Sequence, residues 1–215
     1  MTFLPDITTL LAFTAAAIVL IVTPGPDMTL LIGKTLTQGR KAGLASVVGA
    51  STGILIHSAL AAFGVSVLLA ASEVAFTALK IVGALYLIYL AVQAIRKGSA
   101  FAVEAVEVSH EPLGRIWLQG LGINLLNPKV VLFFVTFLPQ FVSAADPDAA
   151  AKLFFLGFYF VLLAFPACSA MVLGAGALAR FLRESPAALR AFDWTFAGIM
   201  GAFALKLLTA QSLAR

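Results

Sequence analysis

Six long apolar runs limit what this chain can fold into more than any other feature of its sequence. A hydrocarbon layer of roughly 30 Å needs about 20 helical residues to cross it, and each run is close to that length. The runs cover residues 7–32, 42–71, 74–95, 116–141, 153–179 and 192–208. They predict an all-α fold that crosses a lipid bilayer six times.

The composition agrees with this class of protein. Of the 215 residues, 61% are hydrophobic and 11% are charged, and the mean hydropathy is +1.04. Soluble domains contain roughly 45–50% apolar residues. Because no soluble surface hides so many apolar side chains, the bilayer must be the solvent for most of them.

The charged and metal-binding residue types exclude several other functions. The net charge is +4, but the basic residues lie in short gaps between apolar runs, which is typical of a membrane protein and not of a nucleic-acid partner. Cys168 is the only cysteine, which excludes an intrachain disulfide and a thiol relay. His57 and His110 are too few for a histidine-rich metal pathway. We therefore expect no metal and no cofactor.

The basic residues predict which side of the membrane each gap faces. Most of them fall in the first, third and fifth gaps, namely Lys34, Arg40, Lys41, Arg96, Lys97, Arg115, Arg180, Arg183 and Arg190. The second and fourth gaps hold mainly acidic residues. Because cytoplasmic loops carry the excess of Lys and Arg, both termini are predicted to lie outside, with the first run retained as a helix. A five-span chain with one terminus moved is the alternative topology.

The chain divides into two halves of three spans each, residues 1–97 and 115–215. A polar cytoplasmic linker, residues 98–114, joins them and is the least hydrophobic stretch. The third runs of the two halves show a faint similarity around Gly83 and Gly198. Since each half has three spans, the halves enter the membrane from opposite sides, and a duplication would be an inverted repeat.

The first run contains a strong signal for a broken helix. Thr23, Pro24, Gly25, Pro26 and Asp27 interrupt it. Two prolines remove two backbone donors and obstruct carbonyls one turn earlier, so the helix must open around residues 20–24 and restart near Asp27. Free peptide groups cannot face lipid, so this break must be buried or line a water-filled cavity. An acid at this depth costs roughly 2.5–3.5 kcal/mol, which makes Asp27 a candidate site residue. A simple N-cap is its alternative role.

The fourth run repeats the pattern. Asn124, Asn127, Pro128 and Lys129 interrupt it, with Asn127 as the predicted N-cap and Pro128 as the first residue of the restarted helix. Interrupted spans at corresponding places in two halves point to a transporter binding site. Lys129 is expected either to pair with Asp27 or to extend its long stem to the membrane interface.

Other polar residues within the spans are secondary candidates. Gly49, Gly53 and His57 follow one another at four-residue steps, and the two glycines form a small-xxx-small pattern that permits close helix approach. His57 either titrates in a proton path or is a hydrogen-bonded core histidine. Lys80 either extends to the interface or belongs to the pathway.

Taken together, these motifs resemble the LysE/RhtB family of amino-acid exporters. The matching stretches are TPGPD at 23–27, QGRKAG at 38–43, LKIVGALYLIYL at 79–90, GLGINLLNPK at 120–129 and FLPQF at 137–141. The last stretch adds Gln140 as a secondary candidate. The resemblance covers nearly the whole chain, and it implies proton-driven export of amino acids or close derivatives across the bacterial cytoplasmic (inner) membrane.

The resemblance does not select a substrate. Family members are associated with basic amino acids, threonine, homoserine or its lactone, leucine and cysteine, and no residue of this chain distinguishes among them. Whether one copy works alone or as a homodimer also stays open.

The two breaks favour one mechanism for binding a zwitterion. Restarted helices would offer amide groups to a substrate carboxylate, while opened carbonyls and Asp27 would receive its ammonium group. Asp27 is also the candidate for proton coupling, and Lys129 would tune Asp27 or meet the substrate carboxylate. The expected site residues are Thr23, Pro24, Gly25, Pro26, Asp27, Asn124, Asn127, Pro128 and Lys129.

Two other classes of function fit the sequence less well than transport. An intramembrane enzyme would need a nucleophile with a base, or a metal cluster, and the sequence has no HExxH motif, no paired acids within the spans and no Cys/His grouping. A non-transporting membrane scaffold would need close-packing glycines but not two broken helices. Solute-dependent proton flux separates transport from both.

Overall fold

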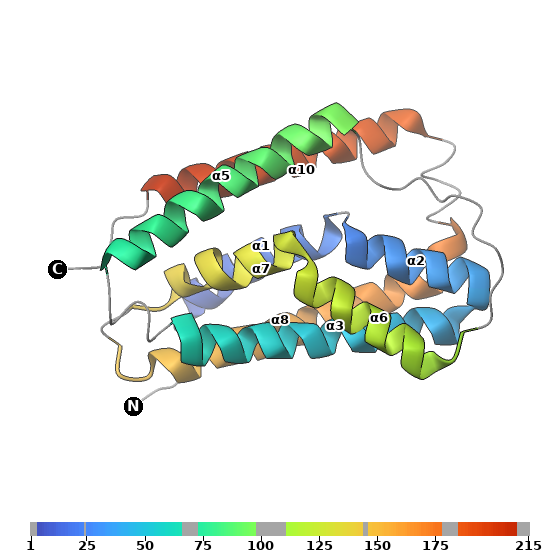
Figure 1. The fold of residues 1–215 in the computed structure, drawn as a ribbon, viewed down its shortest axis with the longest axis horizontal. Coiled ribbons are helices and arrows are strands. Elements are labelled where there is room, and N and C mark those ends of the chain that lie inside the picture. Colours follow the sequence, from blue (N-terminus) through green and yellow to red (C-terminus); the bar gives the residue numbers. More distant parts are fainter. Residues whose placement is uncertain are drawn as a thin grey trace.

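Every regular element in the described part of the chain is a helix (Figure 1). The computed structural model describes residues 4–23, 25–65, 73–97, 111–143, 146–177 and 185–209. The helices are α1 (Ile7–Val22), α2 (Pro26–Gln38), α3 (Arg40–Leu60), η1 (Ala61–Val65), α5 (Glu73–Lys97), α6 (Leu113–Leu126), α7 (Pro128–Leu132), η2 (Phe133–Phe137), η3 (Leu138–Phe141), α8 (Ala149–Leu173) and α10 (Pro186–Thr209). The predicted all-α class is confirmed. Most of the predicted linker, residues 98–114, lies outside the described residues.

Two unbroken helical segments are long and apolar enough to cross a membrane. They are Arg40–Gly64 and Ala149–Leu173, each of 25 residues, with mean hydropathies of 1.6 and 2.1. At about 1.5 Å per residue both exceed the thickness of the hydrocarbon layer. Two bent pairs of helices pass the same test jointly, so the described residues contain two candidate spans, or four if each bent pair is one span. The predicted six-span arrangement stays a prediction.

The two predicted helix breaks are present. α1 and α2 meet at an angle of 52°, and α6 meets the segment Pro128–Phe141 at 51°. The first broken run extends beyond the predicted end at residue 32, because α2 continues to Gln38. Gly39, with a φ of 86°, ends α2 and begins α3. That left-handed backbone favours glycine, and it turns the chain between two helices without a longer loop.

The helices run roughly along the long axis of the molecule, and successive passes alternate in direction (Figure 1). α5 and α10 lie side by side as a separate pair, while the other helices gather on one side of that pair. α1 begins and α10 ends at the same end of the molecule. The ends of α2 and α5, and the starts of α3, α6 and α10, lie at the opposite end.

Glycines bring α3 and α6 into backbone contact. A Cβ atom added to Gly49 would lie 2.1 Å from the carbonyl oxygen of Trp117, and one added to Gly120 would lie 2.5 Å from the carbonyl oxygen of Ser46. The close approach predicted from the glycine stripe of the second run is therefore confirmed. One turn further, a Cβ on Gly53 would lie 2.5 Å from Oδ1 of Asn124. This packing fixes Asn124 against α3.

An aromatic core holds the two broken runs against α8. Phe13 of α1 packs edge-on against Phe141, with ring centroids 5.3 Å apart, and Phe133 lies 5.4 Å from Phe160 of α8. Phe13 and Phe134 are fully buried. Rigid packing of this kind places both breaks at fixed positions relative to each other.

Candidate functional site

The first break exposes the end of one helix and the start of another. α1 ends at Val22, and Thr23 donates from its hydroxyl to the carbonyl oxygen of Val19 over 2.6 Å. α2 begins at Pro26, and Gly25 at its N-cap offers no side-chain hydrogen bond. Pro24 lies outside the described residues. The first amide groups of α2 therefore have no side-chain cap.

The second break is capped by its own asparagine. Asn127 ends α6 and begins α7, and its Oδ1 accepts a hydrogen bond of 3.1 Å from the backbone N–H of Lys129. Pro128 occupies the first position of α7. The predicted N-cap and first helical residue are both confirmed. Proline is favoured at this position because its missing N–H costs no intrahelical hydrogen bond.

Asp27 links the two breaks. Its Oδ2 accepts hydrogen bonds from the side-chain amides of Asn127, over 2.6 Å, and of Asn124, over 3.4 Å. Its Oδ1 is buried and has no hydrogen-bond partner in the described residues. Oδ1 of Asn124 is also buried without a partner, but it is packed against Gly53 of α3. The unpaired oxygen of Asp27 favours the binding of a donor, because a buried acceptor without a partner costs free energy.

Lys129 links the breaks a second time. Its Nζ donates to the carbonyl oxygens of Leu20, over 3.1 Å, and Thr23, over 2.9 Å. The side chain is buried, with 9% of its surface exposed. Its ammonium group lies beyond ion-pair distance of Asp27 among the described residues, although the two charges are near enough to interact. The buried side chain argues against extension to the interface. The opened end of α1 offers carbonyls that bind the ammonium instead.

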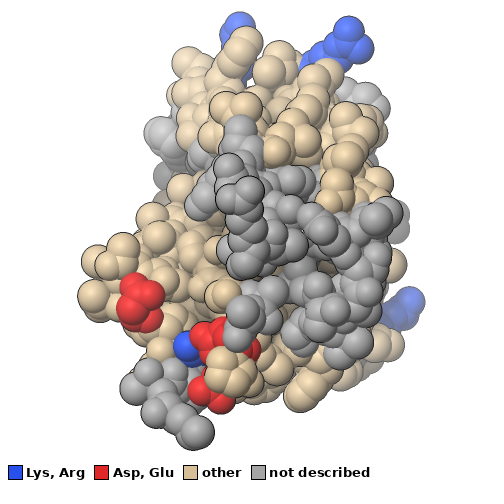
Figure 2. Space-filling view, turned by 90° about the vertical axis from the view of Figure 1, so that its left-hand side faces the viewer, with Lys and Arg blue, Asp and Glu red and all other residues tan. Residues whose placement is uncertain are grey.

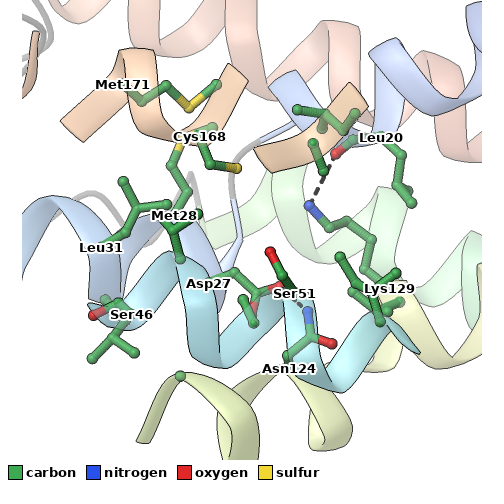
Figure 3. Close-up of a pocket in the computed structure, with 18 of the residues that line it drawn as sticks. Leu20, Asp27, Met28, Leu31, Ser46, Ser51, Asn124, Lys129, Cys168 and Met171 are labelled. Carbon is green, nitrogen blue, oxygen red and sulfur yellow. Dashed lines mark hydrogen bonds between the residues drawn. The ribbon is translucent and has the colours of Figure 1, made fainter. Parts of the chain in front are cut away.

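A small cavity lies between the breaks, α3 and α8. Its volume is about 60 Å³. Its polar end is lined by Thr23, Asp27, Ser51, Asn124 and Lys129, and its apolar end by Met28, Leu31, Val47, Cys168 and Met171. Figure 3 shows the Lys129 side chain pointing toward Leu20, and Asp27 beside Ser51 and Asn124, with the sulfur-containing side chains at the other end.

Two of the secondary candidates, His57 and Gln140, do not line this cavity. His57 is buried and stacked on Phe134 with ring centroids 5.8 Å apart, and its Nε2 has no hydrogen-bond partner in the described residues. Gln140 donates to the carbonyl oxygen of Thr136 over 3.0 Å. The side chain of Lys80 lies outside the described residues.

Sequence reasoning predicted the opened carbonyls around residue 20, because Pro24 has no N–H to offer the carbonyl of Leu20 four residues earlier. It missed that the ammonium group of Lys129 binds these carbonyls. It also missed the apolar end of the cavity, for which the sequence holds no signal, because Cys168 and Met171 lie on an ordinary apolar run.

Away from the breaks, an ion pair joins the C-terminal part of α2 to the segment that precedes α6. Lys34 of α2 donates to Glu111, which precedes α6 and also accepts from Gln119 over 2.7 Å. The backbone N–H of Glu111 donates to the side chain of Gln38 over 2.8 Å. The hydrogen bond from Lys34 is the main reason that the pKa of Glu111 lies below its ordinary value.

The charges differ between the two ends of the molecule. Figure 2 looks onto the end where α1 and α8 begin, and acidic side chains gather in its lower part. In the described part of the chain, the acids at this end include Asp6, Asp146 and Asp148, whereas Lys34, Arg40, Lys41, Arg115 and Arg190 belong to helix ends on the opposite side.

Comparisons with known proteins agree with the motifs. The family model "LysE type translocator" matches residues 18–211. The membrane protein YrhP of Bacillus subtilis is 35% identical over 142 residues, which is 62% of this chain and 68% of that protein. A leucine efflux protein of Salmonella typhimurium is 26% identical over 200 residues, or 93% of this chain and 94% of that protein. No solved structure matches. The chain belongs to the LysE type translocator family.

Proposed function

We propose that this protein exports a neutral amino acid with an aliphatic side chain, such as leucine, from the bacterial cytoplasm. The carrying observation is Asp27, a carboxylate with one unpaired buried oxygen in a cavity where two broken helices meet. The family of the chain and its similarity to leucine efflux proteins support an amino-acid substrate.

The polar end of the cavity fits the two charges of a zwitterion. The substrate ammonium would donate to Oδ1 of Asp27, which has no partner among the described residues. The substrate carboxylate would bind the first amide groups of α2, which have no side-chain cap and lie at the positive end of the helix dipole. Each charge would thus meet a group of opposite sign.

The apolar end of the cavity fits an aliphatic side chain. Met28, Leu31, Val47 and Met171 offer neither charge nor a strong hydrogen-bonding group. The hydroxyl of Ser46, which also lies at this end, donates to the carbonyl oxygen of Ala42. A basic substrate would bury its second charge among them without a partner, at a cost of several kcal/mol. We therefore place leucine-like substrates before lysine or arginine.

Asp27 is also the group that we propose for proton coupling. The same carboxylate would hold either the substrate ammonium or a proton, so that the two compete for one site. If the site faces the two sides of the membrane in turn, each proton that enters replaces a substrate molecule that leaves. Export would then be driven by the proton gradient.

Reconstitution in liposomes tests this function. Leucine counterflow and leucine movement driven by a pH gradient are measured for the wild type, Asp27→Asn, Lys129→Ala and Asp6→Asn. A hydrogen bond to a charged group is worth about 1.5–3 kcal/mol, so Asp27→Asn should lower both rates about 10- to 100-fold. Asp6→Asn is the matched control, because Asp6 caps α1 at the protein surface and asparagine also caps helices.

The outcomes separate the parts of the proposal. Unchanged gradient-driven export in both Asp27→Asn and Lys129→Ala would remove the proposed site. Counterflow of leucine that ignores an imposed pH gradient in the wild type would leave the substrate in place and refute proton coupling. Faster counterflow of lysine than of leucine would refute the role of the apolar end.

We also propose six spans arranged as two inverted repeats, residues 1–97 and 115–215, with both termini outside. The alternating helix directions and the basic end of the molecule support this topology. The repeat is supported by Gly25-Pro26-Asp27 and Asn127-Pro128-Lys129, each of which restarts a helix with proline at its first position. Alkaline phosphatase fused to the C-terminus should be active, because this enzyme is active only outside the cytoplasm. Fluorescence from a reporter that is fluorescent only in the cytoplasm, fused at the same place, would contradict the topology.

A further inference from the structure

The ammonium group of Lys129 lies among backbone carbonyl oxygens at the C-terminal end of α1. The end of α1 is opened, and the carbonyl oxygens of Leu20 and Thr23 converge on Nζ at 3.1 and 2.9 Å. Opened carbonyls at the C-terminal end of a half-helix are where transporters with broken helices bind an inorganic coupling cation. Both the negative end of the helix dipole and the carbonyl oxygens favour a positive charge there.

The surroundings are shaped for this ammonium group. A Cβ atom on Gly25 would lie 3.3 Å from Nζ of Lys129, which is tighter than most real contacts, and 3.5 Å from Cε, so glycine leaves the room that the ammonium needs. Asn127 fixes the start of α7, from which the lysine extends, by accepting from the backbone N–H of Lys129. The lysine therefore reaches the carbonyls from the other half of the chain.

We infer that Lys129 is a built-in cation, which fills with a covalently held ammonium the site where a free Na⁺ or K⁺ would otherwise bind. A free ion could enter and leave during transport, whereas the ammonium of Lys129 stays attached to α7. The inference goes beyond the proposed function: this position needs no inorganic cation, and it ties the end of α1 permanently to the start of α7.

Two substitutions of Lys129 separate a cation site from ordinary packing. Lys129→Ala removes the charge and leaves room for a small cation beside the two carbonyls, whereas Lys129→Met removes the charge and keeps most of the stem volume. Both leave the carbonyls of Leu20 and Thr23 without their donor, so both should unfold about 5–15 °C below the wild type. Only the alanine variant should recover with an added cation.

The measurement is thermal unfolding of the full chain in detergent, in ammonium, potassium, sodium or choline chloride at equal ionic strength. At least one of ammonium, potassium and sodium should raise the unfolding temperature of Lys129→Ala above its value in choline, and all three should leave the wild type and Lys129→Met unchanged. Gly25→Ala displaces the ammonium by a few tenths of an ångström, so it should lower the unfolding temperature less than Lys129→Ala does. Gly33→Ala is its control, because a Cβ there meets nothing within 4 Å.

Several results would overturn the inference. One is a wild type whose stability or transport requires sodium or potassium. Others are a Lys129→Met variant as stable as the wild type and a Lys129→Ala variant that responds to no cation. If Lys129→Ala does not fold in choline, its folding in ammonium-rich medium would support the inference, and its failure there would refute it. Because the readout is stability, the result does not depend on which substrate the protein carries.

Discussion

Replacing one glycine of α6 by alanine tests the close contact that positions the site. A Cβ at Gly120 would lie 2.5 Å from the carbonyl oxygen of Ser46, whereas ordinary contact begins at 3.4 Å. The obstacle is backbone, so no side chain can rotate away, and α3 and α6 must separate by about 0.9 Å. Overpacking of this kind costs about 1–3 kcal/mol.

The same helix contains a matched control. Gly122 lies two residues further along α6, and a Cβ there meets nothing within 4 Å. Both Gly120→Ala and Gly122→Ala gain up to about 1 kcal/mol of helix propensity, so the difference between them isolates the steric cost. For a chain of this length, 1–3 kcal/mol corresponds to about 2–12 °C in unfolding temperature.

The assay can use the single cysteine of the protein. Cys168 is partly buried in the folded chain, so a thiol-reactive dye that becomes fluorescent on reaction reports unfolding without an added label. Gly120→Ala should unfold at a lower temperature than Gly122→Ala. It should also lower transport, because Nδ2 of Asn124 lies 3.4 Å from Asp27, and a shift of 0.9 Å in α6 would break this hydrogen bond. Equal unfolding temperatures of the two variants would refute the backbone contact between α3 and α6.

Two further predictions concern other contacts. The hydrogen bond from Lys34 lowers the pKa of Glu111 below its ordinary value of 4.5, so this pair stabilises the folded state above about pH 4.5, and the contribution is lost as the pH falls through the lower folded value. Unfolding temperatures between pH 3 and 7 should show this loss in the wild type and not in Glu111→Gln. Gly157→Ala should also destabilise the protein, because its Cβ would lie 2.0 Å from Oγ and 2.4 Å from Cβ of Ser58, and adding Ser58→Gly should recover part of the unfolding temperature.

The helix breaks could be predicted because their cause is local. Proline has no N–H wherever it lies, so Pro26 and Pro128 had to begin helices or interrupt them. The contact made by Gly49 was also predictable, because a stripe of small residues on an apolar helix has few uses other than close packing. Both features depend on residues within one or two turns of each other.

The partner of Lys129 could not be predicted in the same way. Asp27 and the opened carbonyls of α1 are both suitable for an ammonium group, and the choice depends on where α7 starts relative to the end of α1. That placement comes from packing between distant helices, such as the contact between Phe133 and Phe160. The separate pairing of α5 and α10 was equally hidden, since apolar helices carry similar patterns whichever neighbour they contact.

The two charged residues of the site occupy equivalent places, and each one binds groups at the helix break of the other. Asp27 and Lys129 each follow the proline that starts a half-helix, and each binds groups of the opposite half. Lys129 uses two of its donors on carbonyls, whereas Asp27 keeps one oxygen unpaired. A movement that exposes the cavity to one side and then to the other would meet different resistance at these two contacts. If the Lys129 contact is the built-in cation that we infer, the halves would turn about it. The change in partners would then occur at Asp27, where under the proposed function a substrate or proton would replace what the movement removes.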